Sequence, residues 1–161
     1  MDETYTAKDF IQKVWINEMK DVVNKHAFLS FALIPIGIEF LGKCRLEELD
    51  HWDLNTQEMH KYKPFDKGLE LMIEVDGRYK GLDLKNQLRN GFAHTLLPKS
   101  KISLSEVKAG DIHFAKDKKD RTILVIEILY RDFVIACKKI LTTNFDKDNK
   151  INKPFLSISN N

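Results

Sequence analysis

Arginine, asparagine and histidine lie close together in one segment of this chain, as Arg89, Asn90 and His94. A histidine titrates near neutral pH, so its imidazole can take a proton from a hydroxyl group or protonate a leaving oxygen. The arginine fork can stabilise negative charge that builds on a phosphoryl group, and the asparagine amide can orient the imidazole or the phosphate. This set predicts metal-independent cleavage of RNA, with a 2′,3′-cyclic phosphate (or 3′-phosphate) and a 5′-hydroxyl as the new ends.

The segment that carries these residues has the pattern of a helix. Its apolar positions recur at steps of four, Asp83 is placed to cap its beginning, and Pro98 is placed to stop it. On an ideal helix Asn90 and His94 lie one turn apart on the same face, whereas Arg89 and His94 are about 140° apart. The long stem of Arg89 still allows its guanidinium to swing beside the imidazole.

Gly91 lies in the middle of this predicted helix, where glycine costs about 1 kcal/mol relative to alanine. A glycine at such a position is understandable if another backbone or a substrate must come close to it, because it has no side chain in the way. We therefore expect a close approach at Gly91.

The run Leu88-Arg89-Asn90-Gly91-Phe92-Ala93-His94 resembles the HEPN signature, which is Arg-Asn, three residues and His. Long helical patterns precede it, and a further one containing Tyr130-Arg131-Asp132-Phe133 follows, as in that all-helical family. The resemblance covers about Asp9 to Asn144. It implies a mainly α, HEPN-like helical bundle of four to five helices.

The resemblance also implies an activity and a partner. Arg89, Asn90 and His94 would be the catalytic residues of an endoribonuclease, a hydrolase used in a toxin–antitoxin, defence or RNA-processing setting. Two such motifs commonly meet across a homodimer in this family, and a second copy would supply the acid or base that a single His94 lacks. No metal or other cofactor is expected.

Two other functions stay open at this stage. The chain could be a non-catalytic HEPN module that binds a nucleotide or a partner protein, such as the other half of a toxin–antitoxin pair. It could also be a helical scaffold without a site, in which Arg89 forms a structural ion pair and is turned into the core. In that case His94 is a helix-end histidine that interacts favourably with the helix dipole.

Glu39 is the supporting residue of the predicted site. It lies one turn past Pro35 in the most apolar segment of the chain, and a buried carboxylate needs a partner. We expect Arg89 or a nearby helix end to provide that partner, which would hold the arginine in place. The alternative is a kink that exposes Glu39 to water.

Apolar periodicity predicts the elements that position these residues within a single HEPN-like domain, residues 1–161 with a core at about 9–144. Polar residues with Lys63-Pro64 at their end predict a connection over residues 51–64. The remaining long segments are predicted as helices at Asp9 to Lys25, Ala27 to Leu49, Phe65 to Glu74 and Ile126 to Asn144.

Between the motif and the last helix the pattern changes to that of short strands. Ile102 to Val107 and Ile112 to Phe114 flank a turn at Ala109-Gly110-Asp111, which predicts an antiparallel β-hairpin. Thr122 to Val125 could add a third strand to this insertion. The polar tail, residues 146–161, is expected to be loosely held.

Composition indicates a soluble protein of a reducing compartment, so we expect a cytoplasmic location. Cys44 and Cys137 have no metal-ligand spacing, and the acidic start of the chain is unlike a signal peptide. The apolar run from Ala27 to Gly42 is shorter than a bilayer span and contains Glu39.

The charge balance does not indicate a dedicated duplex binder, because the formal net charge is only +2. A local basic groove remains possible, and the basic turn at Lys116 to Arg121 could help to hold an RNA phosphate. His51, Asp53 and His60 lie in one loop but without a recognised metal-ligand spacing. We therefore expect RNA or a nucleotide and a second copy of the chain as ligands, with a protein partner or antitoxin as a further candidate.

Overall fold

The computed structural model describes residues 3–159 and is mainly helical, as the sequence predicts. The first long helix runs without a break through α1 (Ala7–Phe10), the π-helical η1 (Ile11–Glu18) and α2 (Met19–Lys25). Thr6 and Asp9 begin it with a capping box, in which each side chain bonds the other's backbone N–H. This helix starts two residues before the predicted Asp9.

Helix α3 (Ala27–Cys44) packs against α5 (Pro64–Val75) with direct contact between their backbones. A Cβ atom on Gly42 would lie 1.6 Å from the carbonyl oxygen of Pro64, and one on Gly68 would lie 1.8 Å from that of Ile38. Only glycine allows this approach. Helix α3 ends at Cys44, five residues before the predicted end at Leu49. The residues between them form turns instead of a helix.

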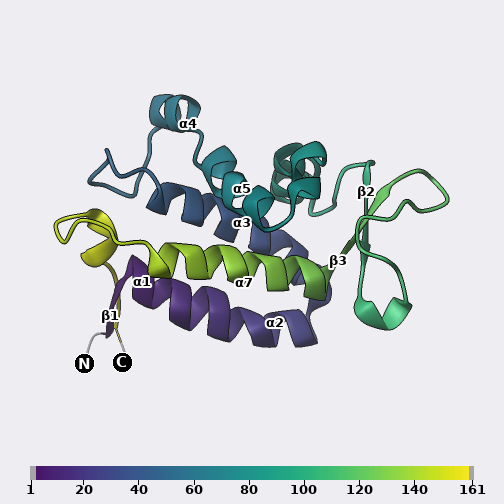
Figure 1. The fold of residues 1–161 in the computed structure, drawn as a ribbon, viewed down its shortest axis with the longest axis horizontal. Helices are drawn as coiled ribbons and strands as arrows, with labels where there is room; N and C mark the ends of the chain where they lie inside the picture. The colour runs from purple at the N-terminus through teal and green to yellow at the C-terminus, as the bar shows by residue number, and fades with distance from the viewer. Residues whose placement is uncertain (1–2, 160–161) are drawn as a thin grey trace.

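Helix α7 (Ile126–Thr142) lies between the α3–α5 pair and the first helix (Figure 1). Its buried face contains Phe133, whose ring meets Trp15 edge-on, with 5.8 Å between the ring centres. Gly37 of α3 leaves room for that phenyl ring. These three helical layers enclose one hydrophobic core, and the termini lie together at one end of it.

The predicted connection over residues 51–64 is wrong in part, because it contains α4 (Thr56–Tyr62). Asn55 and Glu58 form a capping box at its start. Helix α4 buries none of its residues, so it has no apolar stripe from which hydrophobic periodicity could predict it. Lys63 ends it in the left-handed conformation (φ 47°), and α5 begins at the next residue.

The motif segment follows the short 3-10 helix η2 (Gly77–Gly81). It consists of the π-helical η3 (Lys85–Asn90) and of α6 (Gly91–Thr95), and it ends at Leu96 in the left-handed conformation, before the predicted stop at Pro98. The Asp83 side chain makes no cap to the backbone, unlike the prediction, and instead accepts hydrogen bonds from the Asn86 amide.

The predicted antiparallel hairpin is wrong. Strands β2 (Ile102–Ser105) and β3 (Thr122–Val125) form a parallel pair, with Ile102 opposite Thr122. Residues 106–121, which include the 3-10 helix η4 (Val107–Ala109), are the crossover that parallel strands require. Of the three predicted strands, Ile112 to Phe114 is not one, because Phe114 takes the left-handed conformation (φ 67°), and the His113 ring accepts a hydrogen bond from the backbone of Val125.

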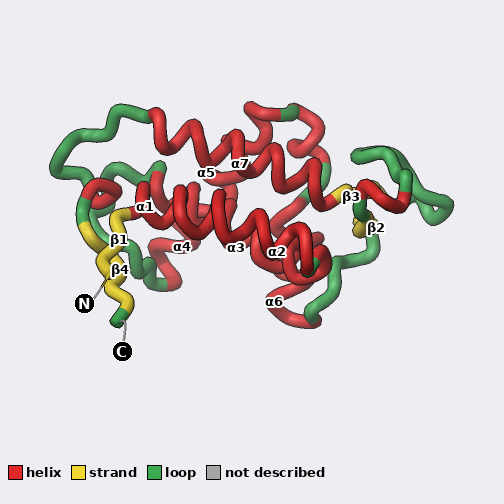
Figure 2. The backbone as a smooth tube through the Cα atoms, turned by 90° about the horizontal axis from the view of Figure 1, so that it is seen from below, coloured by secondary structure: helices red, strands yellow, loops and turns green. Residues whose placement is uncertain are grey.

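The expectation of a loose tail is also wrong for the described residues. Strand β4 (Pro154–Ile158) pairs antiparallel with β1 (Glu3–Thr6) (Figure 2). Before it, Lys150 of the 3-10 helix η5 (Lys150–Asn152) is 3% exposed, and its ammonium group donates to the Leu46 carbonyl oxygen at 3.1 Å. Both contacts join residues far apart in the chain, which local polarity does not reveal.

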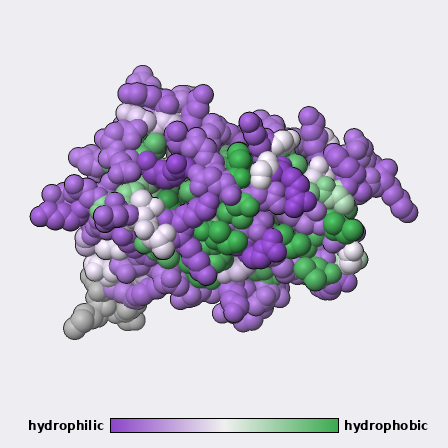
Figure 3. All heavy atoms as spheres, in the orientation of Figure 1, coloured by the Kyte–Doolittle hydropathy of each residue, from purple (hydrophilic) through white to green (hydrophobic). Residues whose placement is uncertain are grey.

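By length and composition α3 could cross a membrane, but half of it is buried inside the protein, as in the core helix of a soluble protein. The face of the molecule in Figure 3 is largely hydrophilic around its rim, with hydrophobic atoms gathered across the middle. The fold is therefore compatible with a soluble protein.

Candidate functional site

Arg89 and Glu39 form an ion pair between the motif segment and α3. The Arg89 Nε lies 3.1 Å from Oε2 of Glu39, and its Nη2 lies 3.5 Å from Oε1. The arginine side chain is 34% exposed and the glutamate 16% exposed. The predicted pairing of Glu39 with Arg89 is thus confirmed, and the guanidinium keeps one edge open to solvent rather than turning into the core.

Asn90 lies between Arg89 and Asn86 in a line of polar contacts. Its side-chain oxygen accepts from Nη1 of Arg89 at 3.4 Å, and its Nδ2 donates to the Asn86 oxygen at 2.9 Å. Asn86 in turn donates to both oxygens of Asp83 at 3.0 Å. This line fixes the Asn90 amide beside the guanidinium, whereas the sequence also allowed it to orient the imidazole.

His94 lies apart from this group. Its side chain is exposed in the last turn of α6, and it forms no hydrogen bond or ion pair with any described residue. The sequence allowed the Arg89 guanidinium to swing beside the imidazole, but Glu39 and Asn90 hold it elsewhere. A single chain therefore brings Arg89, Asn90 and Glu39 into contact. His94 follows them closely in the sequence but is exposed to solvent and contacts none of them through a hydrogen bond.

The expected close approach at Gly91 is confirmed. A Cβ atom there would lie 2.6 Å from the carbonyl oxygen of Leu97, since the chain folds back over the motif helix after Leu96. Gln87 holds this return: its carbonyl oxygen accepts from the Lys99 N–H at 2.9 Å, and its side-chain oxygen accepts from the Lys101 N–H at 3.1 Å.

Two hollows flank the Glu39–Arg89 pair and share both residues. One, of about 440 Å³, is otherwise apolar and lies between α3 and the motif helix. The other, of about 170 Å³, lies between α4, α5 and η3 and is largely basic. The apolar hollow is lined by Ala32, Ile36, Phe92, Ala93 and Leu96, and the basic one by Met59, His60, Lys63, Pro64, Phe65 and Lys85.

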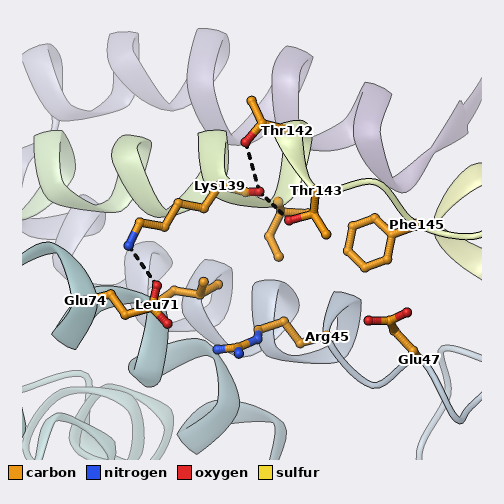
Figure 4. Close-up of a pocket in the computed structure, with 9 residues that line it drawn as sticks. Arg45, Glu47, Leu71, Glu74, Lys139, Thr142, Thr143 and Phe145 are labelled. Carbon is orange, nitrogen blue, oxygen red and sulfur yellow. Dashed lines mark hydrogen bonds and ion pairs between the residues drawn. The ribbon is translucent and has the colours of Figure 1, made fainter.

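A hollow of about 480 Å³ lies at the other end of α5, against the end of α7 (Figure 4). Its cations already have partners: Arg45 pairs with Glu70 at 3.2 Å, and Lys139 pairs with Glu74 at 2.8 Å. Thr142 and Thr143 donate to the backbone oxygen of Lys139 (Figure 4). Since its charges are satisfied internally, this hollow is a poorer candidate for an anionic ligand.

A buried polar network joins the crossover to the bundle, and sequence reasoning missed it. The Tyr79 hydroxyl donates to Oδ2 of Asp132 at 2.8 Å and lies 3.2 Å from Nε2 of His113. Burial, more than the nearby Arg78 and Arg131, lowers the pKa of His113 to about 4, so the imidazole is neutral. All three side chains of the network are under 9% exposed, so they hold the fold together rather than meet a substrate.

The residues considered for a metal do not form a site in the described part of the chain, residues 3–159, which contains no suitable group of three or more His, Cys, Asp or Glu. His51 bonds Asp50 and Glu58 instead. Burial raises the pKa of the Cys44 thiol to about 12 and also raises that of Cys137, so both are inert core thiols.

Comparison of the chain with models of protein families, with curated proteins and with solved structures gives no match.

Proposed function

We propose that this protein is a HEPN-type endoribonuclease that cleaves RNA without a metal ion. The observation that carries the proposal is the Arg89 guanidinium, which is held by Glu39 and Asn90 yet belongs to a side chain that is 34% exposed and so keeps donors for a ligand, five residues before the exposed His94. A phosphate group could accept from those donors. The resemblance of the Arg89 to His94 segment to the HEPN signature supplies the reaction class.

In the proposed reaction the ribose 2′-oxygen attacks phosphorus, and the bond from phosphorus to the 5′-oxygen breaks. A base takes the 2′-hydroxyl proton and an acid protonates the departing 5′-oxygen. His94 serves one of these roles, and Arg89 stabilises the charge on the phosphorane-like transition state. Asn90 keeps the guanidinium in position.

The second acid or base comes from His94 of a second copy in a homodimer. The isolated chain supports this, because His94 has no hydrogen-bond partner among the described residues and because exposed leucines follow it in the chain. Ile36, Leu96 and Leu97 are 55%, 71% and 57% exposed, which is a large exposure for residues of this type. A two-fold contact over this surface would bury them and bring the two motifs together.

The test is cleavage of single-stranded RNA in the presence of EDTA. Arg89→Ala and His94→Ala should each lower the rate by about 10² to 10⁴ while the circular dichroism spectrum is unchanged. His26→Ala, which removes another exposed histidine, is the matched control and should cut like the parent. Two folded variants that cut as fast as the parent would end the proposal.

A second candidate is a non-catalytic module that binds a nucleotide or a protein partner. It is favoured by one observation, the lack of any contact between Arg89 and His94 within the chain. With this function no RNA would yield a product, but His94→Ala would still weaken binding. A cytoplasmic setting belongs to both candidates.

A further inference from the structure

The basic hollow beside the proposed centre has an unusual balance of charge. Lys63, Lys85, His60 and Arg89 line it, against a single carboxylate, Glu39. That carboxylate is already engaged by the Arg89 guanidinium. The hollow is therefore left with lysine charge that nothing on its wall neutralises.

The two lysines are also unpaired beyond the wall of the hollow. Within residues 3–159, neither Lys63 nor Lys85 lies within 4.0 Å of a carboxylate oxygen. Other lysines also lack an ion pair among the described residues, such as Lys20 and Lys25, so what distinguishes Lys63 and Lys85 is that both line one hollow. Two unpaired cations that face one small hollow attract an anion.

The backbone holds the lysines in place from both sides. Lys63 joins α4 to α5 in the left-handed conformation (φ 47°, ψ 61°), a conformation that costs free energy for a residue other than glycine. Pro64 and Phe65, which follow it, are buried. Lys85 begins η3 and lies one turn before Arg89, so it points along the same side of the motif segment.

The size of the hollow fits one anionic group. Its volume is about 170 Å³, which is several times the roughly 30 Å³ that a water molecule takes up in the liquid. It has room for a phosphate group. Because the hollow shares Arg89 with the proposed centre, a phosphate held here would be a close neighbour of the one that is cut.

We infer that Lys63 and Lys85, with Arg89 at the rim, form a subsite for a second phosphodiester group of single-stranded RNA. The inference rests on the proposed function for its substrate class. It assigns α4 and the α4–α5 junction a role in binding the RNA strand, although they lie outside the Arg89 to His94 segment. The two lysines hold the strand by charge and take no part in bond breaking.

The experiment measures binding of a fluorescent single-stranded 2′-O-methyl RNA at several salt concentrations, by anisotropy. This RNA lacks the attacking hydroxyl, so binding is read whether or not the protein cleaves. Lys63→Gln/Lys85→Gln should bind about tenfold more weakly at about 0.1 M salt, and its log–log salt slope should be smaller by about 0.7, the loss expected for one phosphate contact on a single strand.

Two further variants test whether RNA binding depends on where the lysines lie or only on the net charge of the protein. Lys20→Gln/Lys25→Gln removes two exposed lysines of α2 with the same change in net charge, and it should bind like the parent. Lys63→Arg/Lys85→Arg keeps the cations and should also bind like the parent. All of these positions are at the surface or only half-buried, and circular dichroism checks that each variant folds.

Each outcome bears on one proposal or on both. Lysine-dependent binding without cleavage of ordinary RNA supports the subsite and overturns the nuclease. Cleavage by a protein whose binding is unchanged in Lys63→Gln/Lys85→Gln overturns the subsite and leaves the nuclease standing. No binding by the parent, or equal losses in the α2 control, overturns the subsite.

Discussion

The Nε of Arg89 lies 3.1 Å from a carboxylate oxygen of Glu39, although the two residues are fifty positions apart in the chain. This contact fixes the direction of the guanidinium, because Nε and Nη2 donate to Glu39 while Nη1 donates to Asn90, and the side chain is still 34% exposed.

Glu39 should matter for activity more than for stability. Glu39→Ala frees the guanidinium and should lower kcat by about 10- to 100-fold, since small misplacements of a catalytic group have effects of that size. Glu39→Gln keeps an acceptor for Arg89, so its kcat should fall less than that of Glu39→Ala. Single-turnover cleavage at saturating RNA tests whether Glu39→Ala has a lower rate constant than Glu39→Gln.

The same pair predicts a small change in the free energy of unfolding. The arginine is 34% exposed, so breaking the ion pair should cost no more than about 1 kcal/mol. Urea unfolding of Glu39→Ala measures it. A loss of activity that simply follows a loss of folded protein would contradict a positioning role for Glu39.

Mixing the parent with an excess of His94→Ala should lower the activity of the parent if the site is composite. The proposed centre uses one His94 from each copy, so a mixed dimer has one histidine and lacks either the acid or the base. The mixture should cut RNA more slowly than the same amount of parent alone, after time for subunit exchange. Sedimentation at the assay concentration must show a dimer, and a monomer that is fully active would rule out the composite site.

Acid should destabilise the fold through His113. Its pKa is about 4 in the folded protein against 6.5 in the unfolded chain, because burial opposes the charged form. Between these values the unfolded state binds the proton and the folded state does not, so stability is lost as the pH falls from about 6.5 towards 4. The contribution is at most about 3 kcal/mol.

His113→Gln isolates this effect from that of carboxylates such as Asp76, whose pKa is lowered to about 2 by its hydrogen bonds with Arg78. Urea unfolding at several pH values measures the free energy of unfolding. His113→Gln should be less stable than the parent at pH 7, and its free energy of unfolding should fall less steeply as the pH is lowered. His60→Gln, an exposed histidine, is the control and should keep the parent's slope. Equal slopes for all three proteins would mean that His113 does not titrate as described.

One added methyl group on Gly42 should disrupt the packing of α3 against α5. Gly42→Ala places a Cβ 1.6 Å from the Pro64 carbonyl oxygen, which a backbone cannot avoid without moving the helix. We expect a loss of about 1 to 3 kcal/mol or more, which outweighs the better helix propensity of alanine. Gly81→Ala meets nothing within 4 Å and should unfold like the parent in the same urea titration.

Helical segments were predictable where the signal is local. The apolar stripe of the first helix and the run before Phe92 identify α1 to α2 and the motif helix, with errors of a few residues at the ends. Helix α4 was not predicted because it buries no residue and so has no apolar stripe. The capping box of Asn55 and Glu58 was the only sequence pattern that indicated a helix there. That signal was in the sequence and could have predicted it.

Strand pairing was not predictable in the same way. The runs Ile102 to Val107 and Ile112 to Phe114 suggested a hairpin because a glycine turn separates them, yet β2 pairs parallel with β3 on the far side of the crossover. The tail read as polar, but Lys150 and β4 find their partners about a hundred residues away or more. Pairing of this kind depends on contacts that no local window contains.

By itself the sequence determined the order of the helices and the helical spacing of Arg89, Asn90 and His94, since periodicity and rotation per residue act over a few residues. Only the tertiary structure decided that Arg89 turns to Glu39 while His94 stays free, and that Lys63 and Lys85 face one hollow. The reason is that packing of α3 against α5, allowed by Gly42 and Gly68, sets which distant side chains become neighbours.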